Sequence, residues 1–235
     1  MRYFVIPARG GSKIVPDKNV RDLGGRPLLA WTVAGAQAAA GDWPVVVNSD
    51  DKKILDIAEG LGARSYQRPA YLGGDETSMR DVVKDFFRAH DDAEDVVLLY
   101  PTCPFRAAAS LRRAVQLFDF RGARSLMSVS PFNGRPYGGL LMVNGALDYA
   151  ETAEAFYRKQ DTPALYFANG SIYITTRDEA PALNTQLFNK DTLPFILDGF
   201  EQMDIDTEHD LAVCQAVVRA GLVPFPAFAR VGAAP

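Results

Sequence analysis

A glycine-rich, cationic loop follows an apolar run near the start of the chain. Residues 6–13 read IPARGGSK, and Lys18 follows shortly afterwards. Two adjacent glycines let backbone N–H groups turn toward an anion that side chains would otherwise block. The positive charges of Arg9, Lys13 and Lys18 suit a triphosphate, because the charge that develops on a leaving pyrophosphate must be neutralised. The loop has neither a Walker A nor a G-x-G-x-x-G spacing, and the alternative is a flexible surface turn with solvated charges.

Two carboxylates near the other end of the chain have the spacing of a metal site. Asp204 and Asp206 are separated by one residue, and side chains with that spacing share a face at the end of a strand. Two oxygen ligands on one face suit Mg²⁺ (or Mn²⁺), which also binds phosphate oxygens. The alternative is a solvated acidic loop that caps the last helix. The phosphate-type loop in the same chain favours the metal site.

The apolar runs that precede these loops alternate with segments of helical spacing. Five runs are short and apolar enough to be strands buried on both faces, as in a parallel sheet: residues 3–7, 45–47, 96–100, 126–129 and 171–175. Apolar stripes predict helices over residues 54–61, 82–87, 111–118 and 211–218. Ser78 with Asp81, and Thr207 with Asp210, have the spacing of capping boxes. The alternation predicts an α/β fold with a mostly parallel, helix-flanked sheet that binds ligands at its carboxyl edge.

Residues 131–168 break this pattern. The stretch is rich in Pro, Gly, Tyr and Phe, has no clean period, and is too long for a plain loop, which predicts a functional insertion. The remaining residues, 1–130 and 169–235, then form one nucleotide-binding domain. Aromatic residues of the insertion fit a dimer interface, or alternatively a small core of its own; they are Phe132, Tyr137, Tyr149, Phe156 and Tyr157.

The composition of the chain excludes some classes of binding partner. The 235 residues are 48% hydrophobic and 23% charged, which is an ordinary globular composition. A net charge of -4 argues against binding to duplex nucleic acid. No apolar run approaches the ~20 residues of a membrane span, and Cys103 and Cys214 match no metal or redox spacing. We therefore expect a reduced, cytoplasmic protein that binds neither nucleic acid nor membrane.

The first loop and five later motifs closely resemble the acylneuraminate cytidylyltransferases, the CMP-sialic acid synthetases. The loop continues into Pro16-x-Lys18-Asn19, as in the opening signature of that family. The later motifs follow in the family's order: Ser49-Asp50-Asp51; Arg68-Pro69-x-x-Leu72-x-x-Asp75-x-x-Ser78; Tyr100 through Arg106; Arg158-Lys159-Gln160-Asp161-x-Pro163 with Asn169-Gly170-Ser171-Ile172-Tyr173; and Asp204-Ile205-Asp206-Thr207. The resemblance covers residues 3 to about 218, nearly the whole chain.

This resemblance implies a fold and a reaction. The fold would be a Rossmann-like nucleotidyltransferase fold with a small inserted dimerisation subdomain. In the family reaction, the anomeric hydroxyl of a nonulosonic 2-keto sugar acid attacks the α-phosphate of CTP with the help of Mg²⁺, and pyrophosphate leaves. The resemblance also implies a homodimer, in which the insertion of one subunit lends an arginine to the partner's site. The product CMP-sugar would serve the biosynthesis of cell-surface polysaccharide.

The matched positions imply three groups of site residues. The catalytic residues would be Arg9, Lys13, Lys18 and Asp206, with Asp204 and Asp206 as the metal ligands. The nucleotide-binding residues would be Ala8, Arg9, Gly10, Gly11, Ser12, Lys13, Lys18, Asn19, Arg68 and Ser78. The sugar-acid residues would be Tyr100, Arg158, Gln160, Asn169 and Tyr173. Taken alone, Arg68 and Arg158 would be solvated arginines, Ser78 a plain helix cap, and Tyr173 a core residue of a strand.

Several positions depart from the family pattern. Tyr100 stands where the family usually has Gln, and a phenol cannot copy the paired donor and acceptor of an amide. Ile14 and Asp17 replace two glycines, and Arg135 is the candidate replacement for a lysine. These changes leave the particular nonulosonate open; an eight-carbon ulosonate is disfavoured, because that branch resembles a different first loop. The alternatives are an inactive nucleotide-sugar binding module and a nucleotidyltransferase that uses another nucleotide, such as GTP.

Overall fold

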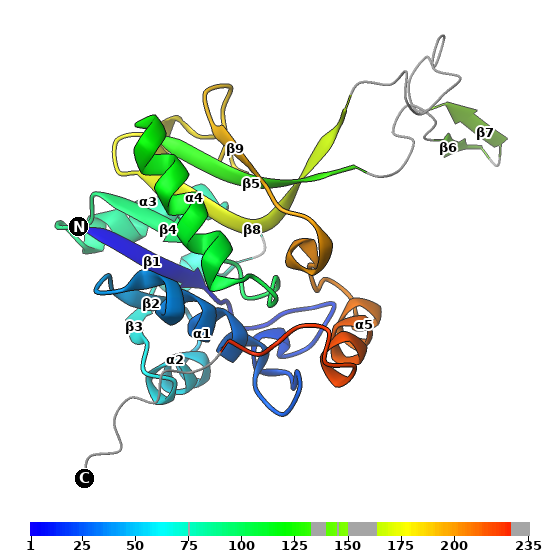
Figure 1. Ribbon diagram of the computed structural model, residues 1–235, viewed down its shortest axis with the longest axis horizontal. Coiled ribbons are helices and arrows are strands. Elements are labelled where there is room, and N and C mark those ends of the chain that lie inside the picture. The colour runs from blue at the N-terminus through cyan, green and yellow to red at the C-terminus, as the bar shows by residue number, and fades with distance from the viewer. Residues whose placement is uncertain (75, 133–139, 145, 150–163, 227–235) are drawn as a thin grey trace.

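A seven-stranded sheet with the order β3-β2-β1-β4-β8-β5-β9 lies at the centre of the molecule (Figure 1). The computed structural model describes residues 1–74, 76–132, 140–144, 146–149 and 164–226. The strands of the sheet are β1 (Arg2–Pro7), β2 (Val45–Ser49), β3 (Arg64–Gln67), β4 (Asp95–Leu98), β5 (Ser125–Pro131), β8 (Tyr166–Thr176) and β9 (Leu193–Ile196). A separate two-stranded sheet pairs β6 (Leu140–Val143) with β7 (Ala146–Tyr149) inside the predicted insertion. The mostly parallel α/β architecture predicted from the sequence is confirmed.

Strand β8 runs against its neighbours. It pairs antiparallel with both β4 and β5, whereas the other pairs of the central sheet are parallel. The predicted run 171–175 is therefore a strand but not a parallel one. The register explains the direction, since Pro131 at the end of β5 lies opposite Tyr166 at the start of β8. The chain leaves the sheet at the end of β5 and re-enters it beside that same end, so β8 must run back along β5.

The described part of the chain has five α-helices, and all but the last of them cover the faces of the central sheet. They are α1 (Leu28–Ala40), α2 (Lys52–Gly60), α3 (Met79–Ala89), α4 (Ala108–Arg121) and α5 (Glu208–Arg219). On one face Phe4 and Ile6 of β1 pack with residues of α1, α2 and α4. On the other face Tyr3 and Val5 pack with α3. The alternation of β1 side chains thus supplies both layers of the core, and none of these helices has the length and hydropathy of a bilayer crossing.

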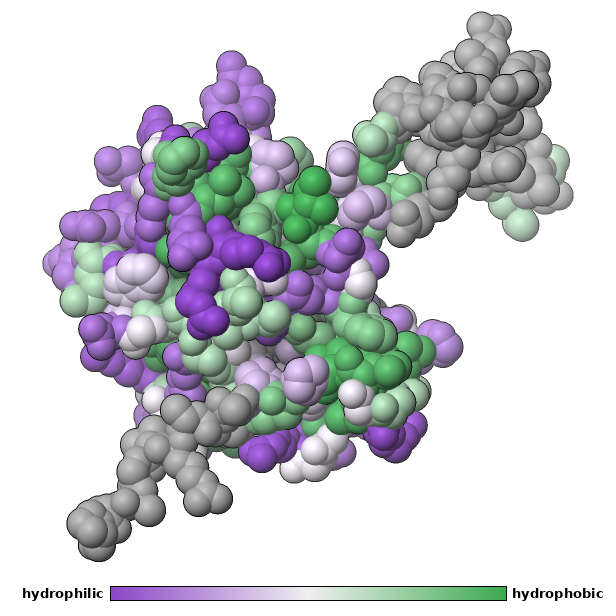
Figure 2. All heavy atoms as spheres, viewed as in Figure 1, coloured by the Kyte–Doolittle hydropathy of each residue, from purple (hydrophilic) through white to green (hydrophobic). Residues whose placement is uncertain are grey.

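Helix α5, near the end of the chain, packs against residues near its start. Its apolar face, with Leu211 and Cys214, packs on Leu23 and Trp31 in and after the first loop, and Figure 1 shows the blue loop beside the red helix. Apolar residues also reach the surface over α5 in Figure 2, in keeping with the partly exposed Val213. This cluster brings the segment before α5, which carries the two aspartates, to the loop after β1.

One of the two predicted capping boxes is complete. The Thr207 hydroxyl accepts the Asp210 N–H at 3.2 Å, and the Asp210 carboxylate accepts the Thr207 N–H at 2.7 Å. At the start of α3 the box is only half formed: Ser78 Oγ accepts the Asp81 N–H, but the Asp81 carboxylate takes the Ser78 hydroxyl. The start of α5, directly after the aspartate pair, is therefore the better fixed of the two.

We expect Thr207→Ala to lower the free energy of unfolding by about 1 kcal/mol, because it removes the acceptor for the Asp210 N–H at the helix start. Chemical denaturation of the purified protein measures this loss. Thr207→Ser keeps the hydroxyl and should recover most of the stability. Equal stability of the alanine and serine variants would contradict a stabilising role for the cap.

Candidate functional site

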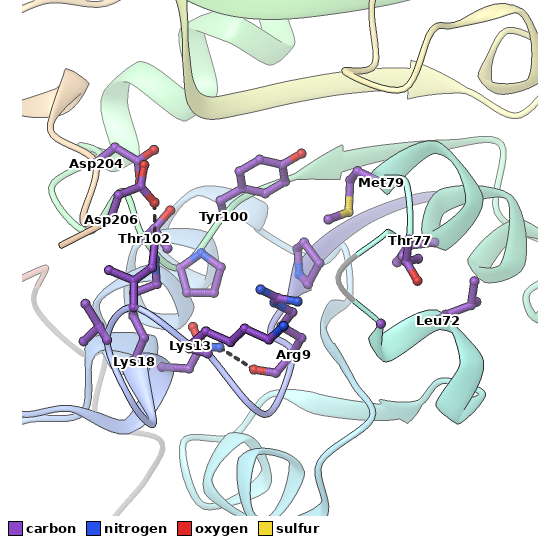
Figure 3. Close-up of a pocket in the computed structure, with 18 of the residues that line it drawn as sticks. Arg9, Lys13, Lys18, Leu72, Thr77, Met79, Tyr100, Thr102, Asp204 and Asp206 are labelled. Atoms are coloured by element: carbon purple, nitrogen blue, oxygen red, sulfur yellow. Dashed lines mark hydrogen bonds and ion pairs between the residues drawn. The ribbon is translucent and has the colours of Figure 1, made fainter.

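A cavity of about 580 Å³ opens at the carboxyl edge of the sheet, beyond β1 and β4. Four segments line it: the loop after β1, the segment from the end of β3 into α3, the loop after β4, and the segment before α5. In Figure 3, Asp204 and Asp206 lie on one side, Leu72, Thr77 and Met79 lie on the other, and Tyr100 lies between them. The structure thus brings the cationic loop and the two aspartates to one cavity at the edge where α/β folds bind ligands.

The predicted site residues divide into three groups by position. Nine line the cavity: Arg9, Ser12, Lys13, Lys18, Asn19, Arg68, Tyr100, Asp204 and Asp206. Six are not among its lining residues: Ala8, Gly10, Gly11, Ser78, Asn169 and Tyr173. Arg158 and Gln160 lie outside the described residues, as do Arg135, Tyr137, Phe156 and Tyr157.

Lys18 bridges the first loop and the aspartate segment. Its ammonium donates to the Ile205 carbonyl at 2.7 Å and lies 3.3 Å from Asp206 Oδ1. Asn19 fixes the loop from within, because its amide donates to the Arg9 carbonyl at 2.9 Å. The loop and the aspartates are therefore connected directly, and a fixed cation lies beside the carboxylates.

Asp204 has the surroundings of a metal ligand. Its Oδ1 is buried and has no hydrogen-bond partner. Burial, followed by the nearby negative charge of Asp206, raises the pKa of Asp204, and the hydrogen bond from Thr102 only partly opposes the rise. An unsatisfied buried carboxylate oxygen is costly unless a cation balances it. Because the described residues hold no cluster of three or more acidic, His or Cys ligands, a bound ion would complete its shell with water and phosphate, as Mg²⁺ commonly does.

The backbone N–H of Gly10 has a different hydrogen-bond partner from the one that the sequence predicts. The sequence predicts that the Gly10 N–H faces an anionic ligand, but it donates to Asp50 Oδ1 at 3.2 Å. The same oxygen accepts a hydrogen bond from Arg68 Nη2 at 3.0 Å. Burial alone would raise the pKa of Asp50, but the bonds from Arg68 and Gly10 outweigh it and lower the pKa. Gly11, with φ of 63°, needs glycine for its backbone conformation.

Two of the residues predicted to bind the sugar acid make their contacts within the central sheet and its core. The Asn169 side chain is buried and uses both its ends there: its oxygen accepts from the Ser171 N–H at 3.0 Å, and its amide donates to Ser130 Oγ at 2.8 Å. Tyr173 is buried in the core beside α3, which agrees with its alternative reading as a strand residue. Its ring centroid lies 5.3 Å from that of Tyr100, so it supports the ring of Tyr100 from behind.

Tyr100 presents a neutral phenol to the cavity. Burial, and then the neighbouring Tyr173, raise its pKa well above the usual value. The group can therefore donate one hydrogen bond and accept others near neutral pH, but it cannot act as an anionic base there.

Three residues that hold other residues of the site in place have no role assigned from the sequence. Asp50 holds Arg68, Thr102 contacts Asp204, and the buried Arg106 fixes the loop after β4. Each lies inside a motif that the sequence singles out. Their partners, however, come from distant segments of the chain, and spacing alone does not show such contacts.

Comparisons with known proteins find a family model and several similar proteins. A family model described as "Cytidylyltransferase" matches residues 3–211. A "CMP-N,N'-diacetyllegionaminic acid synthase" of Legionella pneumophila is 34% identical over 91% of this chain and 94% of its own length. An "N-acylneuraminate cytidylyltransferase" of Escherichia coli is 32% identical over 88% of this chain, which spans only 49% of that relative. A solved structure of "CMP:2-keto-3-deoxy-manno-octonic acid synthetase complexed with CTP" has a TM-score of 0.71 at 19% identity, covering 94% of this chain and 99% of its own, and this likeness shows the fold alone.

Proposed function

The chain belongs to the cytidylyltransferase family, and from that premise we propose that it is an enzyme that joins CMP to a nonulosonic, sialic-acid-like sugar acid. The observation that carries the proposal is the cavity in which the cationic loop after β1 faces the Asp204–Asp206 pair. Its volume of about 580 Å³ is of the size that small-molecule sites have. The relatives named above act on acids of this class, according to their names.

The reaction requires alignment and charge neutralisation more than covalent work by the protein. The anomeric hydroxyl oxygen forms a bond to the α-phosphorus of CTP, the bond from that phosphorus to the pyrophosphate oxygen breaks, and the hydroxyl proton passes to water or to Asp206. Arg9, Lys13 and Lys18 would neutralise the departing pyrophosphate. Arg68 and Asn19, at the cavity wall, would contact the nucleoside. Ser12 is a further donor to phosphate within the same loop.

Asp204 and Asp206 would hold Mg²⁺ or Mn²⁺. The bound ion would supply neutralisation of phosphate charge and a lowered pKa of the attacking hydroxyl. Lys18 lies beside Asp206, and it would share in balancing the charges that gather there. Alternatively, Asp206 itself would accept the proton of the attacking hydroxyl.

The sugar acid would bind on the Tyr100 side of the cavity. We propose that the predicted insertion, 131–168, pairs two subunits and brings Arg158 and Gln160 to the partner's site. An arginine can bind a carboxylate through two parallel hydrogen bonds, and this would offset the repulsion between the acid and the triphosphate. We place the enzyme in the cytoplasm, where its nucleotide substrate is supplied.

Release of pyrophosphate tests the proposal. We expect Mg²⁺-dependent release with CTP and at least one member of a panel of nonulosonic acids, and much slower release with ATP, GTP or UTP. Faster release with GTP would favour the other-nucleotide alternative. Binding of CTP in a calorimeter without turnover on any acid of the panel would favour an inactive binding module and contradict the proposed reaction.

A further inference from the structure

The motif after β2 contains a carboxylate that the proposed reaction does not use. Asp50 belongs to the Ser49-Asp50-Asp51 sequence, and its Oδ1 accepts hydrogen bonds from Gly10 N at 3.2 Å and from Arg68 Nη2 at 3.0 Å. Gly10 belongs to the phosphate-type loop after β1. Arg68 belongs to the segment after β3. One carboxylate oxygen therefore joins two segments that border the nucleotide cavity.

Asp50 lies beside the main cavity and is not among its lining residues. Arg68 lines the main cavity, whereas Asp50 lines a shallower neighbouring one. The Arg68 side chain is only 3% exposed, and its Nε is buried without a hydrogen-bond partner. In the described part of the chain, Asp50 is the one carboxylate within ion-pair distance of Arg68. A buried guanidinium with a single charged partner takes its position from that partner.

The packing around Asp50 leaves its carboxylate little freedom. A Cβ atom on Gly73 would lie 2.5 Å from Asp50 Oδ2, so a larger residue at that position would displace the carboxylate. The Arg68 N–H also donates to the Ser49 carbonyl at 3.0 Å, which fixes the backbone on the other side. The segment from Arg68 to Gly73 thus surrounds the carboxylate, and this close fit restricts the orientation in which Arg68 can be held.

We propose that Asp50 is a positioning residue, which holds the Arg68 guanidinium and the Gly10 turn in one arrangement so that the nucleoside end and the phosphate end of CTP are bound together. The proposal rests on the proposed function, because it takes CTP as the ligand. The contribution of Asp50 reaches the nucleotide through Arg68 and the turn.

Calorimetric titration of CTP into the full chain tests this. We expect Asp50→Asn to raise the Kd for CTP about tenfold or more, because the charged hydrogen bond that orients Arg68 is lost. An asparagine oxygen can still accept the Gly10 N–H, so the loss in Asp50→Asn falls on Arg68. Arg68→Met removes that group, and adding Asp50→Asn to Arg68→Met should therefore change the Kd by less than about twofold. The matched control is Asp85→Asn, since Asp85 is a buried carboxylate that, like Asp50, has a side-chain partner, the Tyr66 hydroxyl at 2.8 Å, and is not among the lining residues. Its Kd should equal that of the wild type.

A glycine pair repeats the test without changing charge. Gly73→Ala displaces the Asp50 carboxylate and should raise the Kd in the same direction, whereas Gly60→Ala, which has open space around its Cβ position, should leave it unchanged. If Asp50→Asn does not fold, the Kd of Gly73→Ala for CTP tests the inference in its place. Wild-type affinity in both variants, or losses in Asp50→Asn and Arg68→Met that multiply in the double variant, would overturn the inference. A wild-type chain that does not bind CTP would overturn the proposed function as well, so the two failures are distinguishable.

Discussion

Replacing Asp206 by asparagine is expected to slow pyrophosphate release by about 100-fold or more, as removal of a group that stabilises transition-state charge does in other enzymes. The substitution removes one negative oxygen from a pair in which Asp204 already has an unsatisfied Oδ1. A metal ion would then be held by one carboxylate in place of two. The fold should be unaffected, because the Asp206 side chain is 69% exposed and its ion pair with Lys18 is long, at 3.3 Å.

The measurement is the rate of pyrophosphate release at saturating CTP and acid, with thermal unfolding run on the same preparations. Glu208→Gln is the matched control, since Glu208 lies close to Asp206, is also largely exposed, and pairs with Arg21 outside the cavity. Raising the Mg²⁺ concentration should partly restore Asp206→Asn but leave the control unchanged. Full turnover by Asp206→Asn would remove this residue from the catalytic group.

The elements that the sequence predicted share one physical property. Buried strands such as β1 and β4 are apolar after their first residue, and helices α2 and α3 carry one apolar stripe each. Helix α1 has no such stripe, because nearly all of its residues are buried and it is apolar on all sides, so its period is not visible. Strand β3 reads RSYQ and is mostly exposed at the edge of the sheet. Its polar sequence predicts a loop, and only its pairing with β2 makes it a strand.

The site was predictable at the level of motifs and less so at the level of contacts. The types and order of the residues in the first loop and in the segment 204–207 predicted that both serve one site, and both line the cavity. The sequence did not predict that Ile205 is the buried residue between the two aspartates, with its N–H bound to Thr102 at 2.9 Å. Nor could spacing show that Asn169 turns into the sheet, since its serine partners lie on β5 and within β8.

Arg106→Met is expected to destabilise the fold by about 3–5 kcal/mol, which is the loss typical of breaking a buried charged network. Arg106 is 3% exposed and donates to the Ser171 carbonyl at 2.5 Å, to Thr32 Oγ1 at 2.7 Å and to the Tyr100 carbonyl at 2.6 Å. Methionine fills a similar volume but removes the guanidinium donor from the buried Ser171 carbonyl and Thr32 hydroxyl, at about 1–3 kcal/mol each, whereas the Tyr100 carbonyl keeps the Cys103 N–H as a donor at 3.3 Å. The guanidinium thus ties β8 and α1 to the loop after β4, which carries Tyr100 and Thr102 into the cavity.

Denaturant unfolding at neutral pH measures this loss, with Arg112→Met as the matched control, because Arg112 lies on helix α4 shortly after Arg106. Arg112 is exposed and donates to the Ala38 carbonyl at 2.8 Å, so its loss should stay within about 0.5 kcal/mol. Burial lowers the pKa of Arg106 to about 10, below its unfolded value. The group is therefore charged in both states near neutral pH, and the difference between the variants should not change between roughly pH 6 and 8. Equal stability of the two variants would mean that the loop after β4 is held by its apolar contacts alone, and that the buried arginine is not needed to position Tyr100.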